Sequence, residues 1–332
     1  MNAELTVRKT IKEHGLIEKG DKVVLGLSGG PDSLCLLYVL AELRQSLGFE
    51  LLALHLNHLM RGEAAEADVR FLEETCAGLG VPLTVRRCDV YKKAADEAIS
   101  VEEAGRKARH GALMELCEEL GGAKAAFAHN RDDQAETVLM RILRGTGVHG
   151  LAAMEYERAD GVIRPLLDTP RSEIEAFCEK RGLIPRFDST NASLDYTRNR
   201  LRLELIPQLA AEYNPSLKEG LARLSANAAE DDSCLEELAD SFIASADISA
   251  GEGLVSVPRK ALKQLHPAVF KRVVRKLFLG LGLDEDIASV HLNPLYRAVM
   301  KANNRAVIEF PHGYSAEAGA GRITLKAPEK DC

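Results

Sequence analysis

Short apolar runs alternate with segments of helical spacing through the first two thirds of the chain. The strand-like runs cover residues 23–27, 50–56, 82–88 and 123–129. The helical segments, in which apolar side chains recur every three or four residues, cover residues 34–43, 63–79, 101–120 and 132–144. Strands that alternate with helices predict right-handed βαβ crossovers and hence a parallel, doubly wound α/β sheet.

The pattern changes after Pro207. Residues 215–246 are rich in alanine and leucine with helical spacing, and two or three further helices are expected before residue 303. Two short strand-like stretches, 306–310 and 321–325, close the chain. We therefore predict an α/β domain at residues 1–210 and a smaller, mainly helical domain at residues 215–332.

Length and composition describe an ordinary globular protein. The chain has 332 residues, of which 46% are hydrophobic and 28% are charged, and this length suits about two domains. Its first residues are polar and charged, and no stretch reaches the roughly 20 apolar residues of a membrane span. We expect a cytoplasmic protein without a signal peptide and without a membrane partner.

The net charge of −7 argues against nonspecific coating of nucleic acid, but it hides local basic clusters. Residues 258–276 contain seven basic side chains and no acidic one. Arg198, Arg200 and Arg202 form a second cluster. Each cluster is either a solvated helix face or a contact surface for phosphates, and we expect the run at 258–276 to contact a phosphate backbone.

A Ser-Gly-Gly-Pro-Asp-Ser turn joins the first strand to the first helix. We expect φ > 0 at both glycines, so that several backbone N–H groups point to one place at a helix N-terminus. A phosphate or pyrophosphate fits such a place, although Asp32 and Ser33 could also be plain helix caps. The turn lacks the lysine of a Walker loop and the spacing of a dinucleotide-binding loop. Cofactor binding is therefore predicted for the residues of the turn, Ser28, Gly29, Gly30, Pro31, Asp32 and Ser33.

Polar side chains follow three of the predicted strands. Ser28 comes after the first strand and His129 after the fourth. The group after the second strand, suited to hydrogen-bonding a nucleotide or orienting phosphates, consists of His55, Asn57, His58 and Arg61. Because ligands of doubly wound sheets bind at the carboxyl ends of the strands, these groups predict one site at that edge.

Three carboxylates begin the helix after the fourth strand. Asp133 and Glu136 are three residues apart, and Asp132 and Glu136 are four apart, so both pairs share a helix face. One explanation is favourable negative charge at a helix N-terminus. The other is a ligand, because a carboxylate pair can hold Mg²⁺ or an ammonium group, and the spacing does not choose between them.

The turn at 28–33 resembles the pyrophosphate-binding loop, or PP-loop, of the N-type ATP pyrophosphatases, which cleave ATP between the α and β phosphates. Together with this loop, an ordered set of motifs is similar to the tRNA(Ile)-lysidine synthetase family. The further motifs lie at residues 55–61, 106–109, 128–137, 144–147, 164–167, 188–191 and 198–202. Gly105 and His110 depart from the family, which more often has alanine and tyrosine there. The length of the chain leads us to expect that the family's additional C-terminal domain is missing or reduced.

The resemblance implies a two-step ligation on a tRNA(Ile) with a CAU anticodon. ATP adenylates the C2 oxygen of the wobble cytidine and releases pyrophosphate. The ε-amine of L-lysine then attacks C2 and expels AMP, and the lysidine formed changes codon reading from AUG to AUA. An unpaired anticodon loop suits this chemistry, because the base must enter a pocket.

The resemblance also implies roles for particular residues. Catalytic roles fall to Asp32, His129, Arg109 and Arg202, with Asp32 as a ligand of Mg²⁺ beside the pyrophosphate. Asp133 and Glu136 would bind lysine, and Arg198 would help His129, Arg109 and Arg202 to orient the α-phosphate and the cytidine. The second domain would contact the tRNA. The oligomeric state stays open, a homodimer being one option.

Two other functions are compatible with a PP-loop. A tRNA cytidine thiolase would be expected to use a Cys-x-x-Cys pair, and the seven cysteines of this chain form none. A noncatalytic module that binds nucleotide and RNA would bind ATP without releasing pyrophosphate. Lysine incorporation into tRNA separates the ligase from both.

Overall fold

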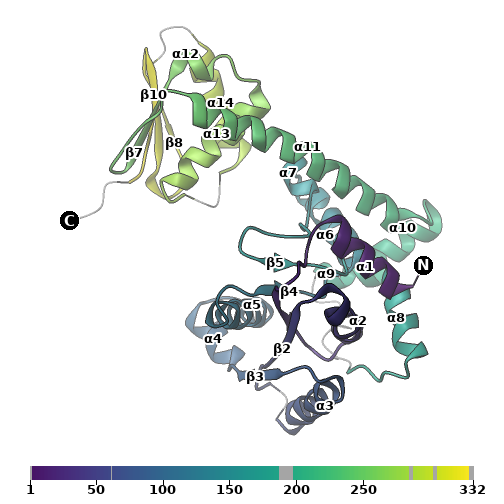
Figure 1. Cartoon of the computed structure of the whole chain (residues 1–332). Helices are drawn as coiled ribbons and strands as arrows, with labels where there is room; N and C mark the ends of the chain where they lie inside the picture. The colour runs from purple at the N-terminus through teal and green to yellow at the C-terminus, as the bar shows by residue number, and fades with distance from the viewer. Residues whose placement is uncertain (1, 61, 187–196, 284–286, 302–304, 329–332) are drawn as a thin grey trace. The chain divides into compact units, whose positions relative to one another are not determined.

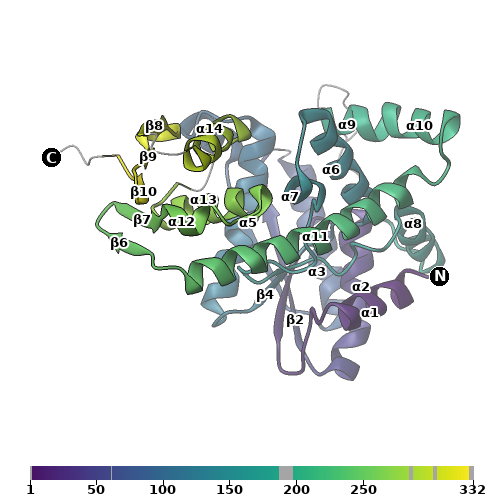
Figure 2. The same ribbon diagram turned by 90° about the horizontal axis from the view of Figure 1, so that it is seen from above.

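The computed structural model describes residues 2–60, 62–186, 197–283, 287–301 and 305–328. It divides the chain into two compact units, Met1–Ala229 and Glu230–Cys332. The division falls inside one helix, α11 (Leu217–Ser245), which is drawn in green in Figures 1 and 2. This is later than the change of composition near residues 210–215, because Leu221 of α11 is buried in a cluster of the first unit.

The first unit is built on a parallel sheet of five strands (Figure 1). The strands are β1 (Lys22–Gly26), β2 (Glu50–Asn57), β3 (Leu83–Arg87), β4 (Lys124–Ala126) and β5 (Val162–Ile163). Their order is β3-β2-β1-β4-β5, and all four pairings are parallel. The predicted doubly wound α/β fold is confirmed, as are its first four strands. The sequence analysis missed β5, since two residues are too few to show a period.

Helices connect and cover these strands. In chain order they are α1 (Ala3–Glu13), α2 (Pro31–Leu47), α3 (Glu63–Leu79), α4 (Val90–Asp96), α5 (Val101–Glu119), α6 (Arg131–Arg144), α7 (Val148–Leu151), α8 (Arg171–Lys180), α9 (Thr197–Arg200), the π-helical turn η2 (Leu201–Leu205) and α10 (Ile206–Glu212). Across the part of the chain that the structure describes, no helix is long and apolar enough to cross a membrane.

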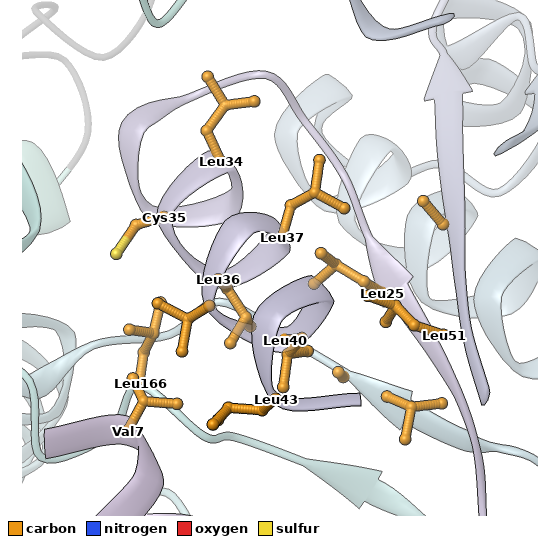
Figure 3. Packing of buried hydrophobic residues seen from close by; sticks show 14 of the residues in the cluster. Val7, Leu25, Leu34, Cys35, Leu36, Leu37, Leu40, Leu43, Leu51 and Leu166 are labelled. Carbon is orange, nitrogen blue, oxygen red and sulfur yellow. The ribbon is translucent and has the colours of Figure 1, made fainter. Parts of the chain in front are cut away.

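Strand β1 contributes alternate side chains to two apolar clusters, one on each face of the sheet. Leu25 packs with Leu37 and Leu40 of α2 on one face, as Figure 3 shows. Val24 packs with Leu113 of α5 on the other face. All five side chains are almost fully buried, and burying a leucine side chain stabilises the fold by about 1.5–3 kcal/mol. A strand buried on both faces explains the continuous apolar run in the sequence.

The second unit combines helices with an antiparallel sheet of five strands. The strands, in the order β6-β7-β10-β9-β8, are β6 (Ser249–Gly251), β7 (Leu254–Pro258), β8 (Ala306–Glu309), β9 (Ser315–Ala318) and β10 (Arg322–Lys326). Its helices, besides the end of α11, are α12 (Arg259–Leu262), α13 (Pro267–Gly280) and α14 (Ser289–Met300), and η3 (Pro311–Gly313) is a short 3₁₀ turn. The two predicted strands are confirmed as β8 and β10. The sheet itself was not predicted: β6 and β9 consist of small and charged residues with weak strand preference, and the alternating pattern of β7 was missed.

Four of the seven basic residues of the run at 258–276 have structural partners inside the second unit, and one of them, Arg275, donates a hydrogen bond to the carbonyl of Ile287 (3.1 Å). The Arg259 side chain is buried and donates hydrogen bonds to backbone carbonyls of Ala298 (2.7 Å), Val299 (3.1 Å) and Gly319 (2.8 Å). The other two are paired with acidic side chains of α11. Arg272 binds Asp232 and Glu236, and Lys276 binds Glu236 and Asp240. The expectation that the whole run contacts phosphate is therefore wrong for the buried Arg259 and stays a prediction for the other residues.

Arg259→Lys should lower the free energy of unfolding by about 2–3 kcal/mol, because one ammonium cannot reach the carbonyls of both segments and leaves buried acceptors unpaired. Urea denaturation measures the change. Lys260→Ala, at the exposed neighbouring position, is the control and should change stability by less than about 0.5 kcal/mol. Equal stability of Arg259→Lys and the wild type would contradict a structural role for Arg259.

Candidate active site

The turn after β1 has a compact backbone fixed by two serine hydroxyls. Gly29 has φ +84°, the left-handed conformation that glycine adopts without strain. The Ser33 hydroxyl donates to the carbonyl of Gly30 (3.1 Å) and accepts the backbone N–H of Ser28 (3.2 Å). The Ser28 and Ser33 hydroxyl oxygens lie 3.1 Å apart. These bonds hold the loop closed against the start of α2.

Gly30 is the N-cap residue of α2 and has φ −73°, so the expected positive φ at Gly30 is wrong. The extended backbone of an N-cap position explains this value. No side chain among the described residues caps the helix, and Pro31 follows as its first residue. The first amides of α2 are therefore available to an anion, and the plain capping role considered for Asp32 and Ser33 is not observed.

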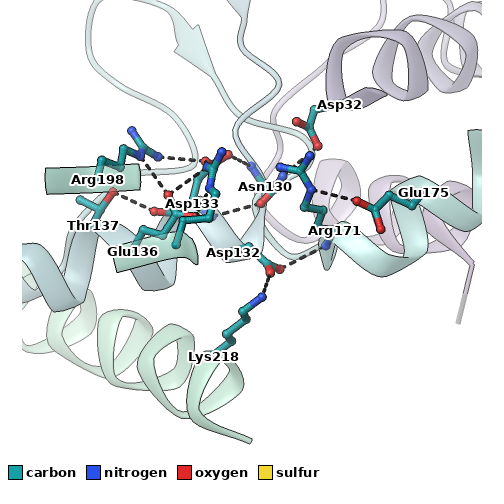
Figure 4. Close-up of polar contacts among 11 residues, drawn as sticks. Asp32, Asn130, Asp132, Asp133, Glu136, Thr137, Arg171, Glu175, Arg198 and Lys218 are labelled. Carbon is teal, nitrogen blue, oxygen red and sulfur yellow. Dashed lines mark hydrogen bonds and ion pairs between the residues drawn. The ribbon is translucent and has the colours of Figure 1, made fainter. Parts of the chain in front are cut away.

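Asp32 lies between the first turns of α2 and α6 (Figure 4). Its Oδ1 accepts a hydrogen bond from Asn130 Nδ2 (2.9 Å). Burial raises the pKa of the Asp32 carboxyl, and the nearby Asp133 carboxylate raises it further, against the lowering effect of Arg171. A cation beside Asp32 would relieve this repulsion, which makes the residue suitable for Mg²⁺. No group of three or more possible metal ligands occurs in the described ranges, but Mg²⁺ commonly uses one or two carboxylates with phosphates and water.

The side chains of Asp133 and Glu136 are almost fully buried and are held by two arginines from the segment of α9 and η2. Arg198 bonds Asp133 Oδ1 (2.9 Å) and Glu136 Oε2 (2.9 Å), as Figure 4 shows. Arg202 bonds Asp133 Oδ1 (2.8 Å) and both oxygens of Glu136 (2.5 and 2.9 Å). Burial alone would raise the pKa of Asp133, but the arginines, His129 and the N–H of Asn130 hold it below its ordinary value. The pair is thus built to bind cationic nitrogen groups.

Asp132 does not join Glu136, contrary to the grouping drawn from their spacing. Its carboxylate accepts the backbone N–H of Arg171 (3.1 Å) and pairs with Lys218, on the side of α6 toward α8 and α11 (Figure 4). A cavity of about 240 Å³ lies there. Its charged lining residues are Arg131, Asp132, Arg171, Glu175, Lys218 and Glu219. Every cation of this lining is paired with an acidic neighbour.

Two side chains of the polar group after β2, His55 and Asn57, bind other residues of this chain. His55 Nδ1 is hydrogen-bonded to the carbonyl of Leu27 (2.8 Å), and burial lowers the pKa of His55. Asn57 donates to Glu66 (3.1 Å) and accepts the N–H of Leu59 (2.9 Å). These contacts hold the end of β2 in place, while a direct contact of His55 or Asn57 with a substrate stays a prediction.

The remaining members of this group are His58 and Arg61. The His58 ring lies beside Gly105 of α5, where an added Cβ would be 3.7 Å from its Cε1. Arg61 lies outside the described residues.

His129 follows β4 at the carboxyl edge of the sheet, as predicted. Burial lowers its pKa to about 4, and the charges of Arg164, Arg198 and Arg109 lower it as well, while Asp133 acts in the opposite direction. His129 is therefore neutral near pH 7. Arg109 is exposed on α5, and its charge also acts on His55. The structure thus brings Arg109, His129, Arg198 and Asp133 into one electrostatic environment.

Two residues to which the sequence analysis gave no role support this site. Asn130 caps α6 through a reciprocal pair of bonds with Asp133 (3.0 and 3.1 Å) while also binding Asp32. The backbone N–H of Arg186 donates to the carbonyl of Gly29 (2.9 Å) and so fixes the PP-loop from a distant segment. An asparagine before an acidic helix start is a recognisable N-cap signal, whereas nothing local in the sequence marks Arg186.

Comparison with known proteins agrees with this geometry. A family model described as "PP-loop domain" matches residues 2–209. The U34-tRNA thiolase NcsA from Methanococcus maripaludis has a similar fold, with a TM-score of 0.56 and 23% sequence identity over 68% of this chain and 76% of that chain. The loop, the parallel sheet and the match to the PP-loop domain model define a PP-loop nucleotide-binding protein.

Curated relatives narrow the class to one family. A tRNA(Ile)-lysidine synthase of Clostridium acetobutylicum is 35% identical over 98% of this chain and 70% of that protein. One of Clostridioides difficile is 41% identical over 81% of this chain and 58% of that protein. The chain belongs to the tRNA(Ile)-lysidine synthase family. This chain spans only part of the length of such relatives. The matched share of the relative is between 48%, for a tRNA(Ile)-lysidine synthase of Clostridium perfringens, and 70%, for that of Clostridium acetobutylicum.

Gly29→Ala should weaken ATP binding roughly tenfold, because an L-residue in the left-handed region costs about 1–2 kcal/mol. Gly30→Ala is the matched control and should bind ATP nearly as the wild type does, since Gly30 has an ordinary φ and its added Cβ would meet only Ser28 Oγ, at 3.5 Å. Isothermal titration with ATP measures both variants. A larger loss in Gly30→Ala than in Gly29→Ala would contradict this account of the loop.

Proposed function

We propose that this chain ligates L-lysine to C2 of the wobble cytidine of tRNA(Ile) with a CAU anticodon, at the expense of ATP. The product is lysidine, which changes codon reading from AUG to AUA. The observation that carries the proposal is a buried carboxylate pair, Asp133 and Glu136, next to Asp32 of the PP-loop. The names of the curated relatives support the same reaction.

The first step forms an adenylated cytidine and releases pyrophosphate. Charge accumulates on the leaving pyrophosphate, and the uncapped amides of α2 with the hydroxyls of Ser28 and Ser33 stabilise it. Asp32 would hold Mg²⁺, which supplies charge neutralisation at the phosphates when bound. Neutral His129 donates a hydrogen bond, and Arg109 supplies charge, to orient the α-phosphate.

The second step needs lysine held with its ε-amine toward C2. Asp133 and Glu136 already bind two guanidinium groups, which supports a site complementary to the cationic groups of lysine. In this proposal Arg198 and Arg202 release the carboxylates to lysine and turn toward the phosphate and the cytidine. Attack of the ε-amine on C2 then expels AMP.

The tRNA would be held by both units. An unpaired wobble base can enter the site at the sheet edge, because its edges are free of pairing. In the second unit Lys260, Lys263 and Arg275 are exposed, and they are our candidates for backbone contacts. Because ATP and tRNA are cytoplasmic substrates, we expect the protein to act in the cytoplasm.

Incubation with a tRNA(Ile) CAU transcript, ATP, Mg²⁺ and radiolabelled lysine tests the function. We expect label in the RNA together with release of pyrophosphate and AMP. Sulfur incorporation instead would indicate the thiolase. ATP binding without release of pyrophosphate would indicate a noncatalytic module.

Glu136→Gln in the same assay should raise the KM for lysine about tenfold or more, because a charge-assisted hydrogen bond contributes about 1.5–3 kcal/mol. The KM for ATP should change little. Thermal melting checks that the variant is folded, since Glu136 also binds Arg198 and Arg202. Equal changes in both KM values would assign Glu136 to metal binding or to the structure of α6.

Replacement of Lys260, Lys263 and Arg275 by alanine should weaken tRNA binding and lower the slope of log Kd against log salt by a little under one unit per lost phosphate contact, about 0.9. The Kd for ATP should not change. Filter binding at several salt concentrations measures the slope. An unchanged slope would remove these residues from the interface and direct attention to the exposed Arg200.

A further inference from the structure

Three aromatic rings are stacked beside the candidate active site. The His110 ring of α5 lies 5.8 Å from that of Phe127, with an interplanar angle of 22°. The Phe127 ring lies 5.7 Å from that of His129, with an angle of 17°. Phe127 therefore connects His110, to which the proposed reaction gives no role, with the histidine at the site.

The fold explains why these rings meet. Phe127 and His129 are two residues apart on the extended segment that continues β4, so their side chains lie on the same face. The N–H of Phe127 donates to the carbonyl of Ile163 on β5 (2.9 Å), which fixes the height of its ring at the sheet edge. Helix α5 covers this face. Its Ala108 and the ring of Phe127 pack against the same apolar cluster.

Burial within this arrangement distinguishes the two nitrogens of His129. Its Nδ1 is buried and has no hydrogen-bond partner among the residues that the structure describes, and the same holds for His110 Nε2. A buried N–H without an acceptor costs more than a bare lone pair, so the hydrogen of neutral His129 belongs on Nε2. His129 is thereby held as a neutral donor through Nε2.

We propose that His110 is a positioning residue for His129. Its ring presses Phe127 against the His129 ring, keeps water from Nδ1 and so fixes both the orientation and the tautomer of His129. The use of His129 as a donor to the α-phosphate rests on the proposed function, whereas the stack and its effect on the tautomer do not.

Charged groups around the stack act on the pKa of His129 in opposite directions. Arg109 of α5, Arg164 after β5 and Arg198 of α9 disfavour a cationic His129, and Asp133 of α6 favours it. Their combined effect with burial keeps the pKa of His129 at about 4.

His110 has a similar environment. Burial is the main cause that lowers the pKa of His110. The positive charges of Arg158, Arg106 and Arg164 lower this pKa further, and Asp160 raises it. Both histidines of the stack are therefore mainly uncharged near pH 7.

The test uses the full chain labelled with ¹⁵N-histidine and observes the ring nitrogens by NMR. His129→Gln assigns the His129 signals among the nine histidines. Three variants are compared with the wild type: His110→Leu removes the aromatic ring, His110→Phe keeps a ring without nitrogens, and His14→Ala removes a distant stack between His14 and Tyr156 (3.6 Å) as control. His110→Gln replaces the leucine variant if that variant does not fold.

We expect the wild type, His110→Phe and His14→Ala to show the Nε2–H tautomer of His129, with a titration midpoint near pH 4. In His110→Leu, water reaches Nδ1, the tautomers mix and the midpoint rises by about one unit or more toward the ordinary value. Wild-type His129 signals in His110→Leu would overturn the proposal. Equal disturbance in His110→Phe would also overturn it, because the ring would then not be the cause.

The ligation assay gives a second, separate measurement. His110→Leu should lower the rate of pyrophosphate release several-fold with nearly unchanged KM values for ATP and lysine, and His110→Phe should restore it. Loss of the rate in both variants alike would overturn the positioning role. If the wild type releases no pyrophosphate, the proposed function fails, and the NMR comparison still decides the role of His110.

Discussion

The parallel pairing of β1 with β2 and β4 determines where the functional groups of the first unit lie. It brings the carboxyl ends of three strands to one edge and starts both α2 and α6 at that edge. Asp32 and Asn130, far apart in the sequence, are therefore in hydrogen-bond contact. Two helix N-termini direct partial positive charge to the same place, which suits a leaving pyrophosphate. The loop, the carboxylate pair and the histidine stack all depend on this geometry.

The sequence was sufficient to predict the first unit because its strands are buried on both faces and read as apolar runs. It was not sufficient for the second unit. There the strands β6 and β9 are short and carry small side chains, so their pairing depends on neighbours that are distant in the chain rather than on local preference. Similarly, the apolar pattern of α11 is continuous, so the sequence does not mark the residue at which the first unit ends and the second begins.

The local backbone of the candidate site could be predicted where a motif defines it, as at Gly29. Prediction failed where long side chains choose between partners. Asp132 and Asp133 are adjacent, yet one binds Lys218 and the other binds Arg198. The sequence suggests that Arg259 is a surface cation in a basic run, but in the structure it is buried and donates to four backbone carbonyls. The spacing of residues in the sequence does not show which partner each of these side chains binds.

Asp133 takes part in two structures through different oxygens. Oδ2 accepts the N–H of Asn130 and closes the start of α6, while Oδ1 accepts both guanidinium groups. Glutamate is common at this position of a capping box and could close the cap, but its longer side chain would move the oxygen that accepts the two guanidinium groups, and asparagine would offer a donor to one of these two sets of donors. The two roles together therefore limit which side chains can replace Asp133 without loss of one of them. If the pair binds an amine as proposed, selection of a different amine depends on Glu136 and its surroundings more than on Asp133.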